Sequence, residues 1–272
     1  MPESAIAQRP LVLHSSDGIR LAAIHWDTGD RAIGCVVAHG FTMHSNRGEV
    51  QRISRTIAAR GIGVISPDLR GHGRSGGYVT AGADEIHDVA AAVAWLRSAG
   101  YRWVAVLGWS MGGSAVLRYA GLGGDADAVV SVSAPGSWFE RGTRSMRVLH
   151  WAFETRTGRA TTRVLKRTRI SPDGWDSVPE APAEVAGGIA PRPLLIVHGE
   201  LDQYLPVRHA DELAAAAPDA EVWIEKDMGH AEVATTEALA DRIGAWVLAK
   251  GEQSLAVCDD GTRDGPRGHW QH

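Results

Sequence analysis

The stretch VLGWSMGGSAVL, residues 106–117, leads from an apolar, β-branched run through a glycine-rich turn into a run compatible with a helix. A chain that turns from a strand into a helix within so few residues needs small neighbours in the turn, and Gly108 and Gly112 supply them. Such a turn would present the hydroxyl of Ser110 outward. Because the same pattern also occurs in ordinary glycine-rich loops, the partners of Ser110 have to decide between the two interpretations.

Short apolar runs alternate with longer helical patterns along the chain. The clearest helix patterns lie in residues 49–60 and 83–100, and Gly61 and Gly100 mark their ends. Eight runs predict strands, at residues 11–15, 20–26, 34–39, 62–68, 103–109, 128–134, 194–199 and 221–225. An early hairpin followed by strand–helix units predicts an α/β fold, with a mostly parallel eight-stranded sheet covered by helices on both faces.

The composition limits the classes of partner and cofactor. The 272 residues suffice for one full-sized α/β domain with an insertion, and the net charge of −4 does not suggest a nucleic-acid partner. We find neither a signal-peptide pattern nor a membrane-spanning apolar stretch, so we expect a cytoplasmic protein without integral membrane association. Two cysteines, twelve histidines without paired-ligand spacing and no phosphate-binding motif predict no metal and no organic cofactor.

A nucleophilic serine needs a histidine to take its proton and a carboxylate to orient that histidine. In a parallel sheet these groups belong at the carboxyl ends of strands. Asp202 follows the strand predicted at 194–199, and His230 follows the one at 221–225. We therefore predict that Ser110, Asp202 and His230 act together.

Two backbone N–H groups are candidates for stabilising a developing oxyanion. The N–H of Met111 lies at the start of the helix that follows Ser110. The N–H of Phe41 follows the tight turn at the end of an earlier strand. Together they predict an oxyanion hole.

Other acids are weaker candidates than Asp202. Asp227 is three residues from His230 and could orient it locally, but we expect a solvated loop residue. Glu200 directly follows a strand and is expected to turn aside. Asp68 is expected to organise its glycine-rich loop with Arg70.

The chain resembles the serine hydrolases of the α/β-hydrolase fold over roughly residues 10–250. The motifs that carry the resemblance are HGFT (39–42), DLRGHGRS (68–75), GWSMGG (108–113), HGELDQYLP (198–206) and MGH (228–230). The first two are similar to motifs of esterase, lipase and cinnamoyl-esterase-like branches, which implies cleavage of carboxylic esters with small to medium acyl groups through an acyl-enzyme. Thioester hydrolysis and carbon–carbon bond hydrolysis use the same serine and remain alternatives, as does a non-catalytic receptor for a small ligand.

The resemblance also implies a lid between the strands at 128–134 and 194–199. We expect residues 137–190 to form two or three amphipathic helices over Ser110, residues 1–136 and 191–250 to form the core, and residues 251–272 to be a disordered tail. Anchoring of the lid is the alternative role for its aromatic residues. The candidates for lining the substrate pocket are His44, Trp109, Trp138, Trp151, Phe153 and Trp175.

The expected lid is strongly basic. Residues 140–170 contain nine Lys and Arg against two Glu, a net charge of +7 that leaves −11 for the rest of the chain. We favour a solvated face bonded to the acidic body. The alternative is attraction of an anionic substrate, such as an acyl-coenzyme A, a phosphorylated acyl carrier or an acidic lipid surface.

Overall fold

The computed structural model describes residues 6–259 and contains an eight-stranded sheet with the order β1-β2-β4-β3-β5-β6-β7-β8. The first two strands pair antiparallel with each other, β2 pairs antiparallel with β4, and the remaining pairings are parallel. The predicted fold class is therefore confirmed. The strands are β1 Ala7–His14, β2 Arg20–Asp27, β3 Ile33–Ala38, β4 Gly63–Pro67, β5 Trp103–Trp109, β6 Ala128–Val132, β7 Leu194–Gly199 and β8 Glu221–Glu225.

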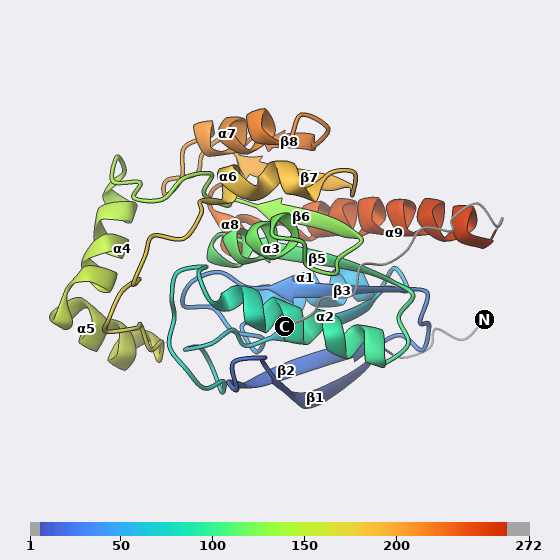
Figure 1. The fold of residues 1–272 in the computed structure, drawn as a ribbon, viewed down its shortest axis with the longest axis horizontal. Coiled ribbons are helices and arrows are strands. Elements are labelled where there is room, and N and C mark those ends of the chain that lie inside the picture. Colours follow the sequence, from blue (N-terminus) through green and yellow to red (C-terminus); the bar gives the residue numbers. More distant parts are fainter. Residues whose placement is uncertain (1–5, 260–272) are drawn as a thin grey trace.

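Helices cover both faces of the sheet (Figure 1). A buried apolar cluster lies on each face of the sheet. Helices α1 and α9 pack on the first face, and α2, α3, α6 and α7 pack on the second. Among the described residues, no helix is both long enough and apolar enough to cross a bilayer. The helices are α1 Gly48–Ala58, α2 Glu85–Ser98, α3 Met111–Gly121, α4 Arg144–Glu154, α5 Arg156–Lys166, α6 Pro182–Ala186, α7 Arg208–Ala216, α8 Ala231–Ala234 and α9 Glu237–Asp259.

The central strand β5 carries the turn at Ser110. All seven of its residues are buried, because it pairs in parallel with β3 and β6 and is covered on both faces. Its side chains alternate between the two clusters, with Val106 on the α3 side and Trp109 on the α1 and α9 side. The turn at its carboxyl end therefore rests on a rigid base.

The tail predicted from residue 251 is partly wrong, because α9 continues to Asp259. Gly251 is buried in this helix, and a Cβ there would lie 2.5 Å from the Ile33 side chain and 3.1 Å from Trp103. Glycine thus lets the helix approach the sheet rather than ending it. Residues 260–272, the remainder of the predicted tail, lie outside the described residues.

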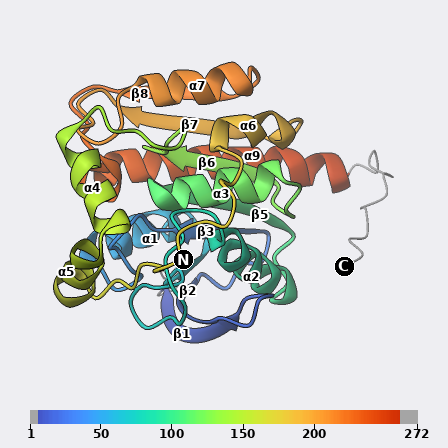
Figure 2. The same cartoon turned by 60° about the vertical axis from the view of Figure 1, so that its left-hand side comes forward.

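The segment predicted as a lid divides into two parts. Helices α4 and α5 stand beyond the carboxyl ends of the parallel strands, at the left of Figure 1, and Figure 2 shows the same separation from a second direction. In contrast, α6 packs against α3 and α7, and a Cβ on Gly121 would lie 2.3 Å from the carbonyl oxygen of Val185. The predicted boundary at residue 190 is therefore too late, because residues 182–189 belong to the core.

Candidate active site

Ser110 occupies a strained turn between β5 and α3. Its φ of 50° and ψ of −115° are unusual for a residue with a side chain. The glycines on either side are required by close backbone contacts: a Cβ on Gly108 would lie 2.2 Å from the oxygen of Gly112, and one on Gly112 would lie 2.2 Å from the oxygen of Ala38. The turn therefore holds the serine hydroxyl at the end of the sheet.

The side chains of Ser110, His230 and Asp202 form one hydrogen-bonded chain. The Ser110 hydroxyl donates to His230 Nε2 at 2.9 Å, and His230 Nδ1 donates to Asp202 Oδ2 at 2.7 Å. The other carboxylate oxygen of Asp202 accepts from the backbone N–H groups of Tyr204, at 2.8 Å, and Leu205, at 3.0 Å. All three predicted residues thus meet, although 120 residues separate Ser110 from His230.

The environment of Asp202 favours its charged form. Burial acts to raise the pKa of this carboxyl, but the hydrogen bond and charge of His230, together with the two backbone N–H donors, lower it. An ionised Asp202 holds the Nδ1 proton in place, so the Nε2 lone pair faces Ser110. The geometry suits proton transfer from the serine hydroxyl to His230.

The loop after β3 leaves the N–H of Phe41 available. On one side of it, Gly40 donates its N–H to the carboxyl of Glu232; on the other, Thr42 donates to His72 Nε2 at 3.1 Å. Within residues 6–259, the N–H groups of Phe41 and Met111 have no hydrogen-bond acceptor. Both therefore remain free to bind a developing oxyanion.

Glu232 is a neighbour of the site that the sequence did not single out. It is 3% exposed, it belongs to α8, and burial raises its pKa. A Cβ on Gly40 would lie 3.2 Å from one Glu232 oxygen and 3.3 Å from the Cβ of Ser110. The carboxyl thus connects the loop of His230 to the loop of Phe41, a contact between positions 192 residues apart that no local motif reveals.

A cavity of about 560 Å³ opens beside Ser110 and His230 and is lined largely by apolar and aromatic side chains. The polar tips of two lining indoles are already engaged: Trp138 Nε1 donates to the carbonyl of Pro179 at 2.7 Å, and Trp175 Nε1 donates to that of Thr80 at 2.6 Å. These rings therefore present apolar surface to the cavity. The aromatic lining consists of Phe41, Trp138, Phe139, Phe153, Trp175 and Tyr204.

Comparison with known proteins identifies the family. The model of the serine aminopeptidase S33 family, a group of α/β hydrolases, matches residues 30–185. The chain belongs to this family. The matched part includes Ser110 and Phe41, whereas Asp202 and His230 lie beyond it and are placed by the geometry described above.

Individual relatives of this S33-family protein support the fold. A non-heme haloperoxidase of Rhodococcus erythropolis is 36% identical over 124 residues, which is 44% of this chain and 43% of that protein, so the match spans less than half of this relative. Among solved structures, the esterase Pf2001 of Pyrococcus furiosus has a TM-score of 0.71 at 21% identity and covers 92% of each chain. The α/β hydrolase GrgF of a Penicillium species has a TM-score of 0.74 at 19% identity and covers 92% of this chain and all of that one.

Three of the six predicted pocket residues line the cavity, namely Trp138, Phe153 and Trp175. The other three do not. Trp109 points to the opposite face of the sheet, where its Nε1 donates to Thr235 Oγ1 at 2.9 Å, and Trp151 lies on the outer side of α4 with 43% of its surface exposed. His44 packs beside Gly73, 3.0 Å from the position of a Cβ there.

The remaining predictions about acids have mixed outcomes. Asp68 organises its loop as expected, by accepting from the backbone N–H groups of Ser45 at 2.7 Å and Arg74 at 2.9 Å. Arg70 also holds this loop, but its side chain binds Asp88 and Asp17 rather than Asp68. Throughout the described part of the chain, no group of three or more His, Cys, Asp or Glu side chains is arranged to hold a metal ion.

Proposed function

We propose that this S33-family protein is a serine hydrolase that cleaves carboxylic esters with small to medium, apolar acyl groups. The observation that carries the proposal is the pair of hydrogen bonds that links Ser110 through His230 to Asp202 at the edge of an aromatic-lined cavity. The size and apolar lining of the cavity are those of a small-molecule site rather than of a macromolecular surface.

The proposed reaction proceeds through an acyl-enzyme. Ser110 Oγ attacks the acyl carbonyl carbon while its proton passes to His230 Nε2. The N–H groups of Phe41 and Met111 bind the oxyanion, and Asp202 stabilises the imidazolium. His230 then returns the proton to the leaving alkoxide oxygen as the carbonyl re-forms. In the second half-reaction His230 deprotonates a water molecule, which attacks the acyl carbon and releases the acid and the free serine.

Peptide hydrolysis, which the family description names, has less support from the cavity. An aminopeptidase needs a carboxylate for the ammonium group of its substrate. Of the three acidic side chains that line the cavity, Glu140 is bound by Arg208 and Glu154 by Arg141, and Asp173 is exposed to solvent, where a carboxylate holds an ammonium group only weakly. An ester requires no such group, so the ester reaction is the better match.

The test is hydrolysis of p-nitrophenyl esters of graded acyl length, with aminoacyl p-nitroanilides and acyl thioesters as parallel substrates. We expect ester hydrolysis by the wild type and a loss of at least about 10³-fold in Ser110→Ala. The matched control is Ser98→Ala, which removes a serine hydroxyl of α2 that donates to the carbonyl of Trp95. Preference for the anilides or thioesters would replace the ester proposal, and turnover that survives in Ser110→Ala would reject the mechanism.

A further inference from the structure

Helix α4 has two chemically different faces. Met146, Leu149 and Phe153 line the cavity. The opposite face carries Arg144, Arg147, Val148 and Trp151, spaced three and four residues apart, with Val148 58% exposed. One helix thus separates the cavity from an outer surface that mixes apolar and cationic side chains.

Helix α5 extends this outer surface. It packs on α4 through Gly158, where a Cβ would lie 2.2 Å from the carbonyl oxygen of Trp151, and buries Thr162. Its far end exposes Val164 and Leu165, at 75% and 71%, next to basic side chains. We define the outer face as Arg144, Arg147, Val148, Trp151, Arg156, Arg163, Val164, Leu165, Lys166 and Arg167.

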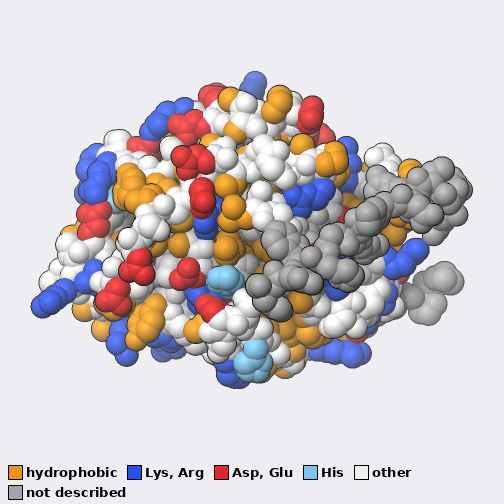
Figure 3. Space-filling model, viewed as in Figure 1, with side chains coloured by type: hydrophobic (Ala, Val, Ile, Leu, Met, Phe, Trp, Pro, Cys, Tyr) orange, Lys and Arg blue, Asp and Glu red, His pale blue; other side chains and the backbone are white. Residues whose placement is uncertain are grey.

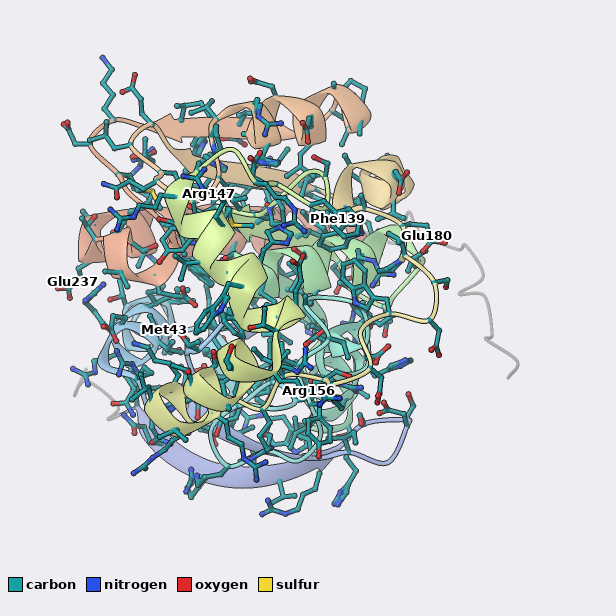
Figure 4. The ribbon with its side chains drawn as sticks, turned by 90° about the vertical axis from the view of Figure 1, so that its left-hand side faces the viewer. Met43, Phe139, Arg147, Arg156, Glu180 and Glu237 are labelled. Carbon is teal, nitrogen blue, oxygen red and sulfur yellow. The ribbon has the colours of Figure 1, made fainter. Side chains whose placement is uncertain are left out.

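The outer face lies on one side of the molecule. Figure 4 looks onto α4 and α5 from outside, with Arg147 and Arg156 labelled on them. In the space-filling view, the corresponding left-hand end of the molecule shows Lys and Arg groups beside hydrophobic ones (Figure 3). Four large apolar side chains of this face, Val148, Trp151, Val164 and Leu165, are each more than 40% exposed and alternate along the sequence with its cations.

The cations of the outer face are not neutralised by the acidic body. The two carboxylates of this region are taken up by other partners: Glu154 pairs with Arg141 and His150, and Glu140 pairs with Arg208 and His209. Within the described residues, no carboxylate oxygen lies within 4.0 Å of any Lys or Arg of the outer face. These cations are Arg144, Arg147, Arg156, Arg163, Lys166 and Arg167. Their charge is therefore available to an anionic partner.

We propose that the outer face of α4 and α5 docks onto an anionic phospholipid surface. A helix with cations around exposed aliphatic and indole side chains matches the interface of a bilayer, where lipid phosphates pair with the cations and the apolar side chains enter the acyl boundary. An acidic protein would match the cations but would leave Val164 and Leu165 without a partner unless it were also apolar. The lipid surface accounts for both features.

Docking in this manner has a consequence for the cavity. Because α4 lines the cavity with one face and carries the outer face on the other, a docked protein holds the cavity within one helix diameter of the lipid. Apolar substrates that partition into the bilayer then become concentrated near Ser110. Docking itself does not depend on the ester reaction, so failure of either proposal leaves the other standing.

The experiment is flotation of the full chain with vesicles of phosphatidylcholine alone or with about 30% phosphatidylglycerol. We expect binding to the anionic vesicles, little binding to the neutral ones, and release by about 0.5 M salt. The variant Arg163→Gln/Lys166→Gln should bind about 25-fold more weakly, since each cation near an anionic surface contributes about fivefold. Val164→Ser/Leu165→Ser should weaken binding about tenfold.

The matched control is Arg9→Gln/Lys250→Gln, which removes the same charge from β1 and α9, away from α4 and α5. This control should change binding less than about twofold. Far-UV circular dichroism and Tm verify that each variant is folded. Three results would overturn the proposal: no flotation with anionic vesicles, equal flotation with both kinds, or equal losses in the control and the outer-face variants.

Discussion

Arg70 is the side chain whose removal should most clearly destabilise the support of the site. It is 4% exposed, and its partner Asp88 on α2 is fully buried. The backbone N–H, Nε and the Nη2 group of Arg70 donate to the Asp88 carboxylate at 2.6, 3.0 and 2.8 Å, and two further bonds, at 2.7 and 3.1 Å, reach Asp17. The bonds to Asp88 hold the loop that follows β4 against α2.

The variant Arg70→Met removes the guanidinium and leaves Asp88 buried without its cation. Breaking a buried pair from one side costs about 3–5 kcal/mol, because the remaining charge is neither solvated nor neutralised. For a chain of this size that loss corresponds to a fall in Tm of about 6–20 °C. Since methionine restores part of the apolar packing, we expect a value near the lower half of this range.

The assay is urea unfolding followed by tryptophan fluorescence, with Tm as a second measure. The matched control is Arg60→Met, because Arg60 also makes a two-bond contact with an aspartate, Asp241, but at the surface, where solvent screens the pair. The double variant Arg70→Met/Asp88→Leu should recover at least half of the loss, since it removes the unpaired charge as well. Equal losses in Arg70→Met and Arg60→Met, or no recovery in the double variant, would refute the reasoning.

Two further predictions concern the site itself. The variant Asp202→Asn loses the carboxylate that fixes the imidazole tautomer, so kcat for an ester substrate should fall by about 10⁴-fold. Stopped-flow measurement of turnover checks this, and a fall of less than about tenfold would contradict the role of Asp202. Burial raises the pKa of Glu232, so the stability that this group contributes is present below its unfolded-state pKa and is lost as the pH rises through the folded-state value. Glu232→Gln keeps an acceptor for the Gly40 N–H and should therefore gain stability relative to the wild type as the pH rises above the ordinary pKa of a glutamate. Parallel Tm curves of the two proteins over this rise in pH would disprove it.

The architecture was predictable where the local pattern and the tertiary environment agree. Strand β5 is continuously apolar because it is buried on both faces, and α2 has an apolar stripe because one side faces the sheet. The positions of Asp202 and His230 followed from the rule that parallel strands place their carboxyl ends together. Each of these inferences used only neighbours in the sequence and the topology of the sheet.

The failures arise where a long-range contact decides the outcome. The sequence from residue 251 onward predicts a disordered tail, yet in the fold Gly251 permits α9 to approach Ile33 and Trp103. Glu232 is held in place by its hydrogen bond from the Gly40 N–H. Arg70 binds Asp88 rather than Asp68, which is nearer in the sequence, because the packing of α2 places Asp88 beside the guanidinium. Such choices depend on packing between segments that a single sequence does not place.

The most direct measurement is covalent labelling of the protein with a fluorophosphonate, followed by mass spectrometry of the peptides. The account predicts one adduct, on Ser110, that is absent in Ser110→Ala and forms at least about 10³-fold more slowly in His230→Gln, because His230 can no longer take the serine proton. Labelling at an unchanged rate in His230→Gln, or an adduct on another residue with Ser110 unmodified, would contradict the central claim.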